Sequence, residues 1–470
     1  MMTIRTLEPL IRENLARLQG VYDLCPSPAR NLLTSARGWV LTRIRNAPET
    51  FELLCELRSH ESWSANEAAE FQLRELQRVL NEARATVPFY KDYAPLTIRN
   101  FDDWRRLPVV NRETVRQNQH RLLSNATPSF RRIPAATSGT TGANLKVAYT
   151  EDLARENWAF TLRHWAWAGI EPRQPRMTLF GARIVPASRT EPPFWTHNFA
   201  ERQVLLSIFH LSARTIPAYL DFLRANPGKI LEGFPSVLGI LADFALRHAQ
   251  TIPMRAVFTT GEPLYPVLRE KIERAFNARV FDSYGMTEYC GMIHECEGGQ
   301  MHLIPEYGFL EILDDHNEPV QPGQEGDFVW TGFRNSAMPL IRYRIGDRGR
   351  WLVSDPCPCG RRFPLVVPTI TRESDILRCL DGRLFSPRAL NQLLKQATSL
   401  RFCQFVHDHP DHVVVRAVSA NGRAGEDVSE ICMRLQELLG ARMRVEAEFA
   451  SEPLTRAGGK IPLIVNEMRR

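Results

Sequence analysis

The stretch "MRAVFTTGEPLYPVLREKIERAFNARVFDSYGMTE", residues 254–288, decides the fold class. Its apolar runs at 254–260 and 278–282 read as strands, and each runs into a polar loop, "GEPL" or "SYGMTE". The segment between them, "YPVLREKIERAFN", has the apolar spacing of a helix. A strand, a helix and a second strand in succession predict parallel strands. Their carboxyl-end loops gather at one edge of the sheet, where ligands usually bind.

The same alternation extends over residues 130–350, with a strand predicted in "RMTLFGARIV" (176–185) and a helix in "PSVLGILADFALRHAQ" (235–250). The following segment, 307–333, reads as an antiparallel meander with turns at Asp314–Asn317 and Pro322–Gly326. The sequence therefore predicts an α/β fold in which mixed parallel sheets are flanked by helices.

Two flanking regions complete the predicted organisation. Residues 1–90 form a helical lead-in, whose clearest helix begins after the N-cap candidate Ser64 and ends at Pro88. From about residue 370 the pattern changes to short strands, "HVVVRAVSA" and "RVEAEFA", and two amphipathic helices, over 388–399 and 426–441. We expect a large domain over residues 1–370 and a small, mobile α+β domain over 371–470.

Composition excludes several classes of function. The 470 residues carry a net charge of +6 without a block of Lys and Arg, so a nucleic-acid partner is not expected. Nine scattered cysteines indicate a reducing, cytoplasmic setting. The most apolar run begins at Ile230 but contains Glu232, Pro235 and Asp243, which excludes a membrane span. The first residues carry charges every few positions, unlike a signal peptide.

A loop rich in hydroxyls and glycines precedes the predicted α/β core. It consists of Thr137, Ser138, Gly139, Thr140, Thr141 and Gly142, with Lys146 just beyond it. Glycines let backbone N–H groups approach an anion, and hydroxyls donate to phosphate oxygens. The spacing does not match a Walker loop. Taken alone, such a cluster is equally typical of a surface turn.

Further polar blocks follow this loop in order. They are "TTGEPL" (259–264), "SYGMTE" (283–288), "IRYRIGD" (341–347), "TRESDILRCLDGRLFSP" (371–387) and "LTRAGGK" (454–460). Together, these blocks resemble the adenylate-forming superfamily of acyl-CoA and aryl-CoA synthetases, peptide-synthetase adenylation domains and luciferases. The resemblance covers roughly residues 80–470. It is closest to the phenylacetate–coenzyme A ligase branch, and within it to adenylating proteins associated with capsular polysaccharide.

The resemblance implies ATP-dependent activation of a carboxylic acid as an acyl-adenylate, with AMP, Mg²⁺ and pyrophosphate as the other participants. The acyl group would then pass to coenzyme A. A carrier protein, an amine or a hydroxyl group remains open as the acceptor, as does a homodimeric assembly. A non-catalytic nucleotide-binding scaffold is the alternative from another class, but the presence of Lys460, Glu288 and Asp347 argues against it.

The resemblance also assigns roles to residues. The loop Thr137–Gly142 and Lys146 would hold the β- and γ-phosphates, and Lys460 would bridge the carboxylate and the α-phosphate. Thr287 would contact the α-phosphate, and Glu288 would hold Mg²⁺. Asp347 would accept the ribose hydroxyls, and Arg372 would reach the phosphates or ribose. The residues expected around adenine are Tyr284, Gly285, Gly261, Glu262 and Pro263. Thr371 and Ser374 depart from the usual hinge pattern of the family.

Four further side chains are soft metal ligands that have no predicted role in binding the nucleotide. Cys296, His302, Cys357 and Cys359 form a Cys₃His set, the stoichiometry of a structural zinc site, and the branch often carries a set of this kind. His294 and Cys290 lie close by in the sequence but are outside the predicted set. A filled tetrahedral site would pin two loops together without an open position for water. The alternative is four unligated side chains.

The acyl pocket is expected in residues 180–203, ahead of Leu205. Phe194, Trp195 and Phe199 point to a large apolar or aromatic acid, and Arg183 or Arg189 is a candidate partner for its carboxylate. The alternative is a surface loop whose aromatic side chains cap the core. The sequence does not name the acid.

Overall fold

The computed structural model describes residues 20–136, 145–352, 357–369, 377–385, 389–390, 392–397, 399–419, 424–454 and 462–467. Its centre is an eight-stranded sheet with the strand order β11-β10-β9-β8-β7-β4-β6-β5. The strands are β4 (Arg176–Leu179), β5 (Trp195–Asn198), β6 (Gln203–Leu206), β7 (Ile230–Gly233), β8 (Ala256–Thr260), β9 (Val280–Gly285), β10 (Met292–Glu295) and β11 (Met301–Leu303). The inner strands from β9 to β6 run parallel, and the pairs at both edges are antiparallel.

The unit predicted over residues 254–288 is confirmed as β8, α10 (Pro266–Phe276) and β9, with the two strands parallel neighbours. Pro266 begins α10, where the missing N–H of proline has no helical partner to lose. Asn277 ends it with a φ of +40°, a conformation that asparagine adopts more readily than most residues. This turn directs the chain back into β9 and brings the loops after both strands to one edge.

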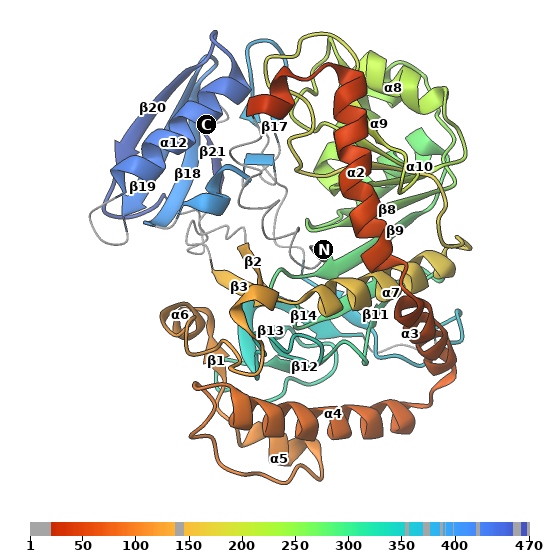
Figure 1. The fold of residues 1–470 in the computed structure, drawn as a ribbon, viewed down its shortest axis with the longest axis vertical. Coiled ribbons are helices and arrows are strands. Elements are labelled where there is room, and N and C mark those ends of the chain that lie inside the picture. Colours follow the sequence, from red (N-terminus) through yellow and green to blue (C-terminus); the bar gives the residue numbers. More distant parts are fainter. Residues whose placement is uncertain are drawn as a thin grey trace, which may run out of the picture.

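Helices cover both faces of this sheet (Figure 1). On one face, α8 (Ile216–Arg224), α9 (Pro235–Arg247) and α10 enclose a core that includes Met177, Leu231 and Val257. On the other face, α3 (Pro48–Ser59) and α7 (Glu151–Trp167) pack over Ile230 and Phe258. Helix α2 (Ser27–Arg45) lies against the edge strand β5 and against α7. The expected α/β architecture is confirmed.

A second sheet contains β12 (Gly308–Leu313), β13 (Gly326–Gly332), β14 (Tyr343–Trp351), β15 (Val366–Pro368) and β1 (Val110–Asn111). Strands β12, β13 and β14 form the predicted antiparallel meander. Both predicted turns lie between β12 and β13, and each holds a residue with positive φ, +65° at Asn317 and +88° at Gly323. Strand β1 adds to β14 in parallel and brings the start of α6 (Arg112–Gln117) to this sheet.

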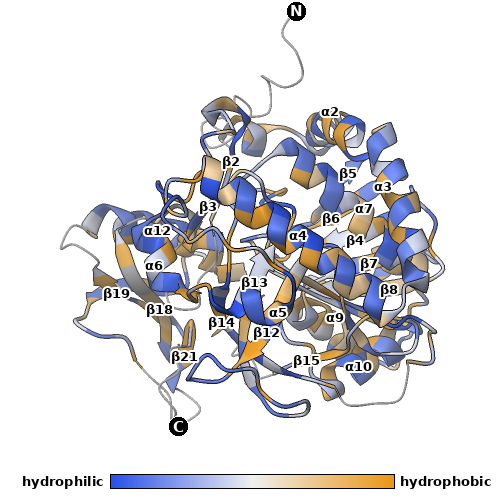
Figure 2. Ribbon diagram, turned by 90° about the horizontal axis from the view of Figure 1, so that it is seen from below, coloured by the Kyte–Doolittle hydropathy of each residue, from blue (hydrophilic) through white to orange (hydrophobic). Residues whose placement is uncertain are grey.

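Helix α4 (Ala65–Thr86) packs on the second sheet through the apolar stripe expected from its sequence. Figure 2 shows polar and apolar residues alternating along it. The hydroxyl of Ser64 accepts a hydrogen bond of 3.2 Å from the backbone N–H of Glu67, whose carboxylate accepts one of 2.7 Å from the N–H of Ser64. This capping box stabilises the helix start by about 1 kcal/mol. The helix ends at Thr86, and its C-cap residue Val87 directly precedes Pro88.

The C-terminal region forms a separate four-stranded sheet, ordered β20-β19-β18-β21, with α12 (Gly425–Leu439) packed on it. The strands are β18 (Leu400–His409), β19 (His412–Ser419), β20 (Arg444–Phe449) and β21 (Ile464–Asn466). Strands β19 and β20 and helix α12 agree with the prediction, whereas β18 was not predicted. Instead of the full helix expected over 388–399, the described residues contain a short 3₁₀-helix, Gln392–Gln396, in which the consecutive Leu393 and Leu394 are both buried.

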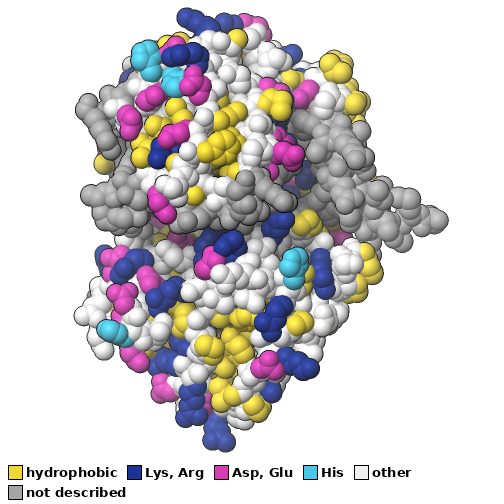
Figure 3. Space-filling model, turned by 90° about the vertical axis from the view of Figure 1, so that its left-hand side faces the viewer, with side chains coloured by type: hydrophobic (Ala, Val, Ile, Leu, Met, Phe, Trp, Pro, Cys, Tyr) yellow, Lys and Arg dark blue, Asp and Glu magenta, His cyan; other side chains and the backbone are white. Residues whose placement is uncertain are grey.

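The surface agrees with the mixed charge of the sequence. Basic and acidic side chains are interspersed over the face shown in Figure 3. Within the described part of the chain, no helix combines the length and the apolar character needed to cross a membrane.

Candidate active site

A two-stranded hairpin carries the hydroxyl-rich loop. Strand β2 (Ile133–Ala136) pairs antiparallel with β3 (Lys146–Tyr149), and Ala136 lies opposite Lys146. This pairing fixes both ends of the loop, and Lys146 is exposed at the start of β3. Thr137, Ser138, Gly139, Thr140, Thr141 and Gly142 themselves lie outside the described residues, as do Arg372 and Lys460.

The ends of β8 and β9 lie side by side, because Thr260 pairs with Ser283. Gly261 follows β8 with a φ of +79°, which glycine adopts without strain. The carboxylate of Glu262 accepts a hydrogen bond of 3.0 Å from the N–H of Ser236, in the first turn of α9. Glu262 thus caps a neighbouring helix, and Pro263 beside it is exposed. The predicted adenine-flanking segment forms a rigid turn at the expected edge of the sheet.

Tyr284, predicted to face adenine, and Asp347, predicted to bind the ribose, are in direct contact. The hydroxyl of Tyr284 donates a hydrogen bond of 2.7 Å to Oδ2 of Asp347, which lies on β14 in the other sheet. The ring of Tyr284 stacks at 6.2 Å on Trp330, which holds its orientation. Burial raises the pKa of Tyr284, and the nearby carboxylate raises it further, so the hydroxyl keeps its proton. Asp347 itself is exposed.

Glu288 is buried at the end of the "SYGMTE" block. Its Oε1 accepts a hydrogen bond of 3.1 Å from the hydroxyl of Tyr343 and one of 3.4 Å from Nη1 of Arg112. Burial raises the pKa of Glu288, and the charge of Arg112 opposes that rise. Both donors approach Oε1. Thr287, the residue before Glu288, is half-buried, and Gly285 is exposed with open space around its Cα.

Arg112 is a site residue that the sequence analysis did not single out. It begins α6, where the side chain of Asn111 caps the helix by accepting a hydrogen bond of 2.9 Å from the N–H of Thr114. Parallel pairing of β1 with β14 then brings Arg112 beside Glu288. The only signal in the sequence is the capping pattern "NRET", which predicts a helix start but not its neighbour 176 residues away.

A cavity of about 490 Å³ lies beside the strand ends that carry Thr260, Ser283 and Tyr284. Its aromatic walls are formed by Tyr149, Trp158, Trp165, Phe180, Phe258 and Tyr289. Charged and polar side chains also line it, among them Arg45, Arg176, Thr178, Gln203 and Glu232. This position next to Tyr284 makes the cavity the candidate acyl pocket.

The expected lining of this pocket needs correction. Of the segment 180–203, only its two ends, Phe180 and Gln203, contribute. Phe194 is buried in the core on the other face of the sheet, Trp195 stacks on Phe222, and Phe199 is 64% exposed. Phe194 and Trp195 both pack against α8, through Tyr219 and Phe222, and Phe199 lies in the turn after β5.

The two arginines proposed as partners of the carboxylate are used elsewhere. Arg183 forms ion pairs with Asp23 at 3.0 Å and with Glu437 at 3.4 Å. Arg189 donates hydrogen bonds to Ser27 at 3.4 Å and to the carbonyl of Pro192 at 3.3 Å. Both therefore tie surface segments together.

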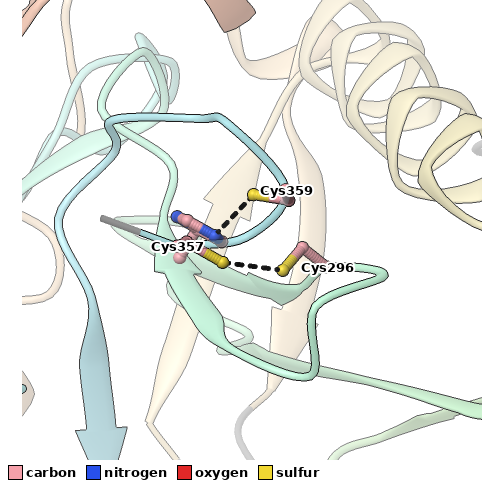
Figure 4. A group of neighbouring side chains, drawn as sticks. Cys296, Cys357 and Cys359 are labelled. Carbon is pink, nitrogen blue, oxygen red and sulfur yellow. Dashed lines mark hydrogen bonds between the residues drawn. The ribbon is translucent and has the colours of Figure 1, made fainter. Parts of the chain in front are cut away.

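The four predicted soft ligands converge, with their ligand atoms all within 4.8 Å of one another (Figure 4). Cys296 follows β10, His302 lies on β11, and the two other cysteines lie between β14 and β15. The sulfur atoms of Cys296 and Cys357 are 3.5 Å apart, and Sγ of Cys359 is 3.4 Å from Nε2 of His302. Nδ1 of His302 lies 3.1 Å from the carbonyl of Phe363. Donation from Nδ1 leaves the lone pair of Nε2 free for a metal ion, so the donor set fits tetrahedral zinc.

The nearby candidates excluded from this set are engaged in other contacts. His294 stacks on His164 with ring centroids 4.2 Å apart. Nε2 of His164 lies 3.0 Å from the carbonyl of Glu295, and burial lowers the pKa of His164 to about 3. The thiol of Cys290 is directed at the sulfur of Met286 at 3.2 Å. Neither His294 nor Cys290 belongs to the four-ligand cluster.

Comparison with known proteins identifies the family. A sequence profile described as AMP-binding enzyme matches residues 68–336. The chain belongs to the AMP-binding enzyme family. It is 23% identical to Protein CapK of Staphylococcus aureus over 96% of this chain and 100% of that protein. It is 25% identical to a phenylacetate-coenzyme A ligase of Thermus thermophilus, over 65% of this chain and 70% of that one.

The solved structures show the same fold. A 2-hydroxyisobutyryl-CoA ligase in the postadenylation state superposes with a TM-score of 0.54 and 20% sequence identity, over 87% of this chain and 92% of that one. The resemblance drawn from the sequence blocks is therefore confirmed for family and fold. The chain is an enzyme of the AMP-binding family with a large N-terminal and a smaller C-terminal region.

Proposed function

We propose that the protein activates a small carboxylic acid with ATP, as an acyl-adenylate, and then transfers the acyl group to coenzyme A. The observation that carries this proposal is the hydrogen bond between Tyr284, which lines the cavity, and Asp347. It links an aromatic face on the wall of a space that a small acid can occupy to an exposed carboxylate, and the buried Glu288 follows four residues after Tyr284. The names of the coenzyme A ligases among the relatives support this choice of reaction and acceptor.

On the nucleotide side, Tyr284 provides the face for adenine, and Asp347 accepts the ribose hydroxyls. Gly261, Glu262, Pro263 and Gly285 form the turns around the base. Glu288 would hold Mg²⁺ through Oε2, because its Oε1 already accepts hydrogen bonds from Tyr343 and Arg112. When bound, Mg²⁺ supplies positive charge to the phosphates.

The chemical step joins two anions. A carboxylate oxygen of the acid attacks the α-phosphorus of ATP, the bond from that phosphorus to the bridging oxygen breaks, and pyrophosphate leaves. Positioning and positive charge therefore matter more than proton transfer. We assign that charge to Lys460, with Lys146 and the loop Thr137–Gly142 on the outer phosphates, Thr287 on the α-phosphate and Arg372 near the phosphates or ribose. Lys460, Arg372 and the loop lie outside the described residues.

The second half-reaction requires a rearrangement of the small region, which we place beyond residue 370. Transfer to coenzyme A is the proposal favoured by the named relatives, and a carrier protein, an amine or a hydroxyl group is the alternative acceptor. Use of ATP and coenzyme A agrees with a reducing, cytoplasmic setting, as do the nine cysteines, all of them free thiols.

The Cys₃His cluster is proposed as a structural zinc site. It joins β10, β11 and the segment after β14, which belong to the two sheets that meet at the nucleotide site. A zinc ion there would hold the sheets in register without touching the reacting atoms.

The experiment that tests the proposed function is exchange of labelled pyrophosphate into ATP, with a panel of aryl, alicyclic, fatty and hydroxylated acids. Exchange that depends on one class of acid supports adenylation. Release of AMP on addition of coenzyme A then tests the acceptor. ATP binding without exchange for any acid would indicate the scaffold alternative instead.

A further inference from the structure

The floor of the cavity is polar, although its walls are aromatic. Arg176 and Thr178 point from β4 to the same face of the sheet as Glu232 of β7. The hydroxyl of Thr178 donates a hydrogen bond of 3.2 Å to Oε2 of Glu232, and Nε of Arg176 lies 3.6 Å from the same oxygen. An apolar acid would displace water from this floor without supplying a hydrogen bond in its place.

The floor lies at a definite depth below the nucleotide end of the cavity. Glu232 pairs with Phe258 on the neighbouring strand, and Thr260 lies two residues further along that strand, beside Ser283. Because a strand rises about 3.3 Å per residue, Glu232 lies roughly 7 Å below the strand ends. A substrate whose ring or chain has a comparable length would reach from the strand ends to the floor.

The charges on this floor cancel. Glu201 lies behind the floor and forms two ion pairs. Its Oε1 lies 2.9 Å from Nη1 of Arg45, and its Oε2 lies 2.5 Å from Nη2 of Arg176. With Glu232 as the second carboxylate, two cations face two anions, and all of them except the half-buried Arg45 are largely buried. An additional charged group from a substrate would remain uncompensated there, so the floor favours a neutral polar group.

One hydrogen-bonding position on the floor remains open. The hydroxyl of Thr178 donates to Glu232 and accepts a hydrogen bond of 2.8 Å from Nε2 of Gln203, so its single O–H has no donor capacity left for a substrate. Oε2 of Glu232 accepts the hydrogen bond from the Thr178 hydroxyl, whereas no side chain in the described part of the chain donates a hydrogen bond to Oε1. Burial raises the pKa of Glu232, and a donor at Oε1 would oppose that effect.

We propose that the acid substrate carries a neutral hydroxyl group at the end remote from its carboxylate, and that this hydroxyl donates to Oε1 of Glu232. The inference rests on the proposed function and specifies its substrate class. Trp158, Trp165 and Phe258 bracket the carbon skeleton, so a ring or a short branched chain bearing the hydroxyl fits the walls. Glu232 thereby discriminates hydroxylated acids from their unsubstituted analogues.

The test compares matched pairs of acids, each with and without the remote hydroxyl, by pyrophosphate exchange with the full-length protein. Aryl acids with a para hydroxyl, their alicyclic counterparts and ω-hydroxy chain acids form the pairs. Because hydrogen bonds to charged groups contribute about 1.5–3 kcal/mol, kcat/KM for the hydroxylated member should be higher by about 10-fold to 100-fold.

Two variants assign the preference to Glu232. Glu232→Leu should reduce the ratio between paired acids to within about 3-fold, mainly by loss of the hydroxylated substrate. Glu232→Gln keeps an acceptor oxygen of similar shape and should retain a ratio of about 3-fold to 10-fold. Glu270→Gln, which removes an exposed carboxylate paired with Arg274 on the surface of α10, should leave the ratio unchanged. Thermal unfolding checks that each variant folds. If Glu232→Leu does not fold, the test rests on Glu232→Gln.

The outcomes separate the two proposals. Equal exchange for both members of every pair, or a preference that survives Glu232→Leu, overturns the role of Glu232 and leaves adenylation intact. A preference for ammonium-bearing acids overturns the neutral hydroxyl. Absence of exchange with every acid removes the proposed function, and this inference with it.

Discussion

The hydroxyl of Tyr284, at the end of β9, donates a hydrogen bond of 2.7 Å to Oδ2 of Asp347 on β14. This contact joins the parallel sheet to the meander at the point where the nucleotide is proposed to bind. It holds an exposed carboxylate in one orientation before ATP arrives, so less rotational freedom is lost on binding.

Tyr284→Phe tests this preorganisation. The ring that faces adenine remains, but the bond to Asp347 is lost, and we expect KM for ATP to rise by about 3-fold to 10-fold with little change in kcat. Tyr22→Phe is the matched control, because it removes a hydroxyl that bonds to Thr34 and Ile184 away from the site. A similar rise in both variants would mean that the Tyr284 hydroxyl has no special role.

Lys460→Ala should lower the rate of adenylate formation by about 10²-fold or more, because a positioned cation acts mainly in the transition state. ATP binding should mostly survive, since the loop and Asp347 remain. Stopped-flow release of pyrophosphate and ATP titration, measured on the same sample, separate the two effects. Unchanged pyrophosphate release would exclude the proposed role of Lys460.

Metal analysis should find one zinc ion per chain in the purified protein. Cys357→Ser and His302→Ala should each lose that metal and lower the thermal midpoint, because both ligands hold segments of different sheets together. Cys55→Ser, at an exposed cysteine, should change neither quantity. Two zinc ions per chain, or a full complement in the variants, would contradict this ligand set.

The sequence predicted those features that depend on local chemistry. Ser64 was predicted as an N-cap from its own residue type and the helical pattern after it, and its hydroxyl accepts the expected hydrogen bond from the N–H of Glu67. The Cys₃His set was expected from its soft ligands and from the family resemblance, and its four side chains converge in the structure, whereas zinc binding stays a prediction. The strand–helix–strand unit followed from periodicity, and its parallel pairing followed from the general behaviour of such units.

Features fixed by distant partners could not be predicted in this way. Arg112 reaches Glu288 only because β1 joins β14, and nothing near Arg112 in the sequence records that pairing. Arg176 and Glu232 are distant in the sequence, and only the pairing of β4 with β7 brings them together. Phe194 and Trp195 were expected in the pocket because they are aromatic, but both pack against α8, Phe194 on Tyr219 and Trp195 on Phe222.

A buried ion pair provides the final prediction, which concerns stability and pH. Arg163 on α7 donates to both carboxylate oxygens of Glu306, and both side chains are 0% exposed. Burial alone raises the pKa of Glu306, but the charge of Arg163, with hydrogen bonds from His60 and Arg163, outweighs it and brings the pKa to about 2. Glu306→Gln leaves the guanidinium buried without its counter-charge, so we expect a loss of about 3–5 kcal/mol near neutral pH.

The sign of the pH dependence follows from the lowered pKa. The stabilising contribution of Glu306 is complete above the pKa of the unfolded chain, about 4.5, and is lost as pH falls through the folded pKa of about 2. The gap in unfolding free energy between wild type and Glu306→Gln should therefore be constant from pH 7 to 5. It should then narrow by about 3 kcal/mol towards pH 2, as measured by urea titration. Glu270→Gln, at a surface pair, should show a small gap at every pH. A gap for Glu306→Gln that stays constant below pH 4 would show that shape, and not charge, sets its contribution.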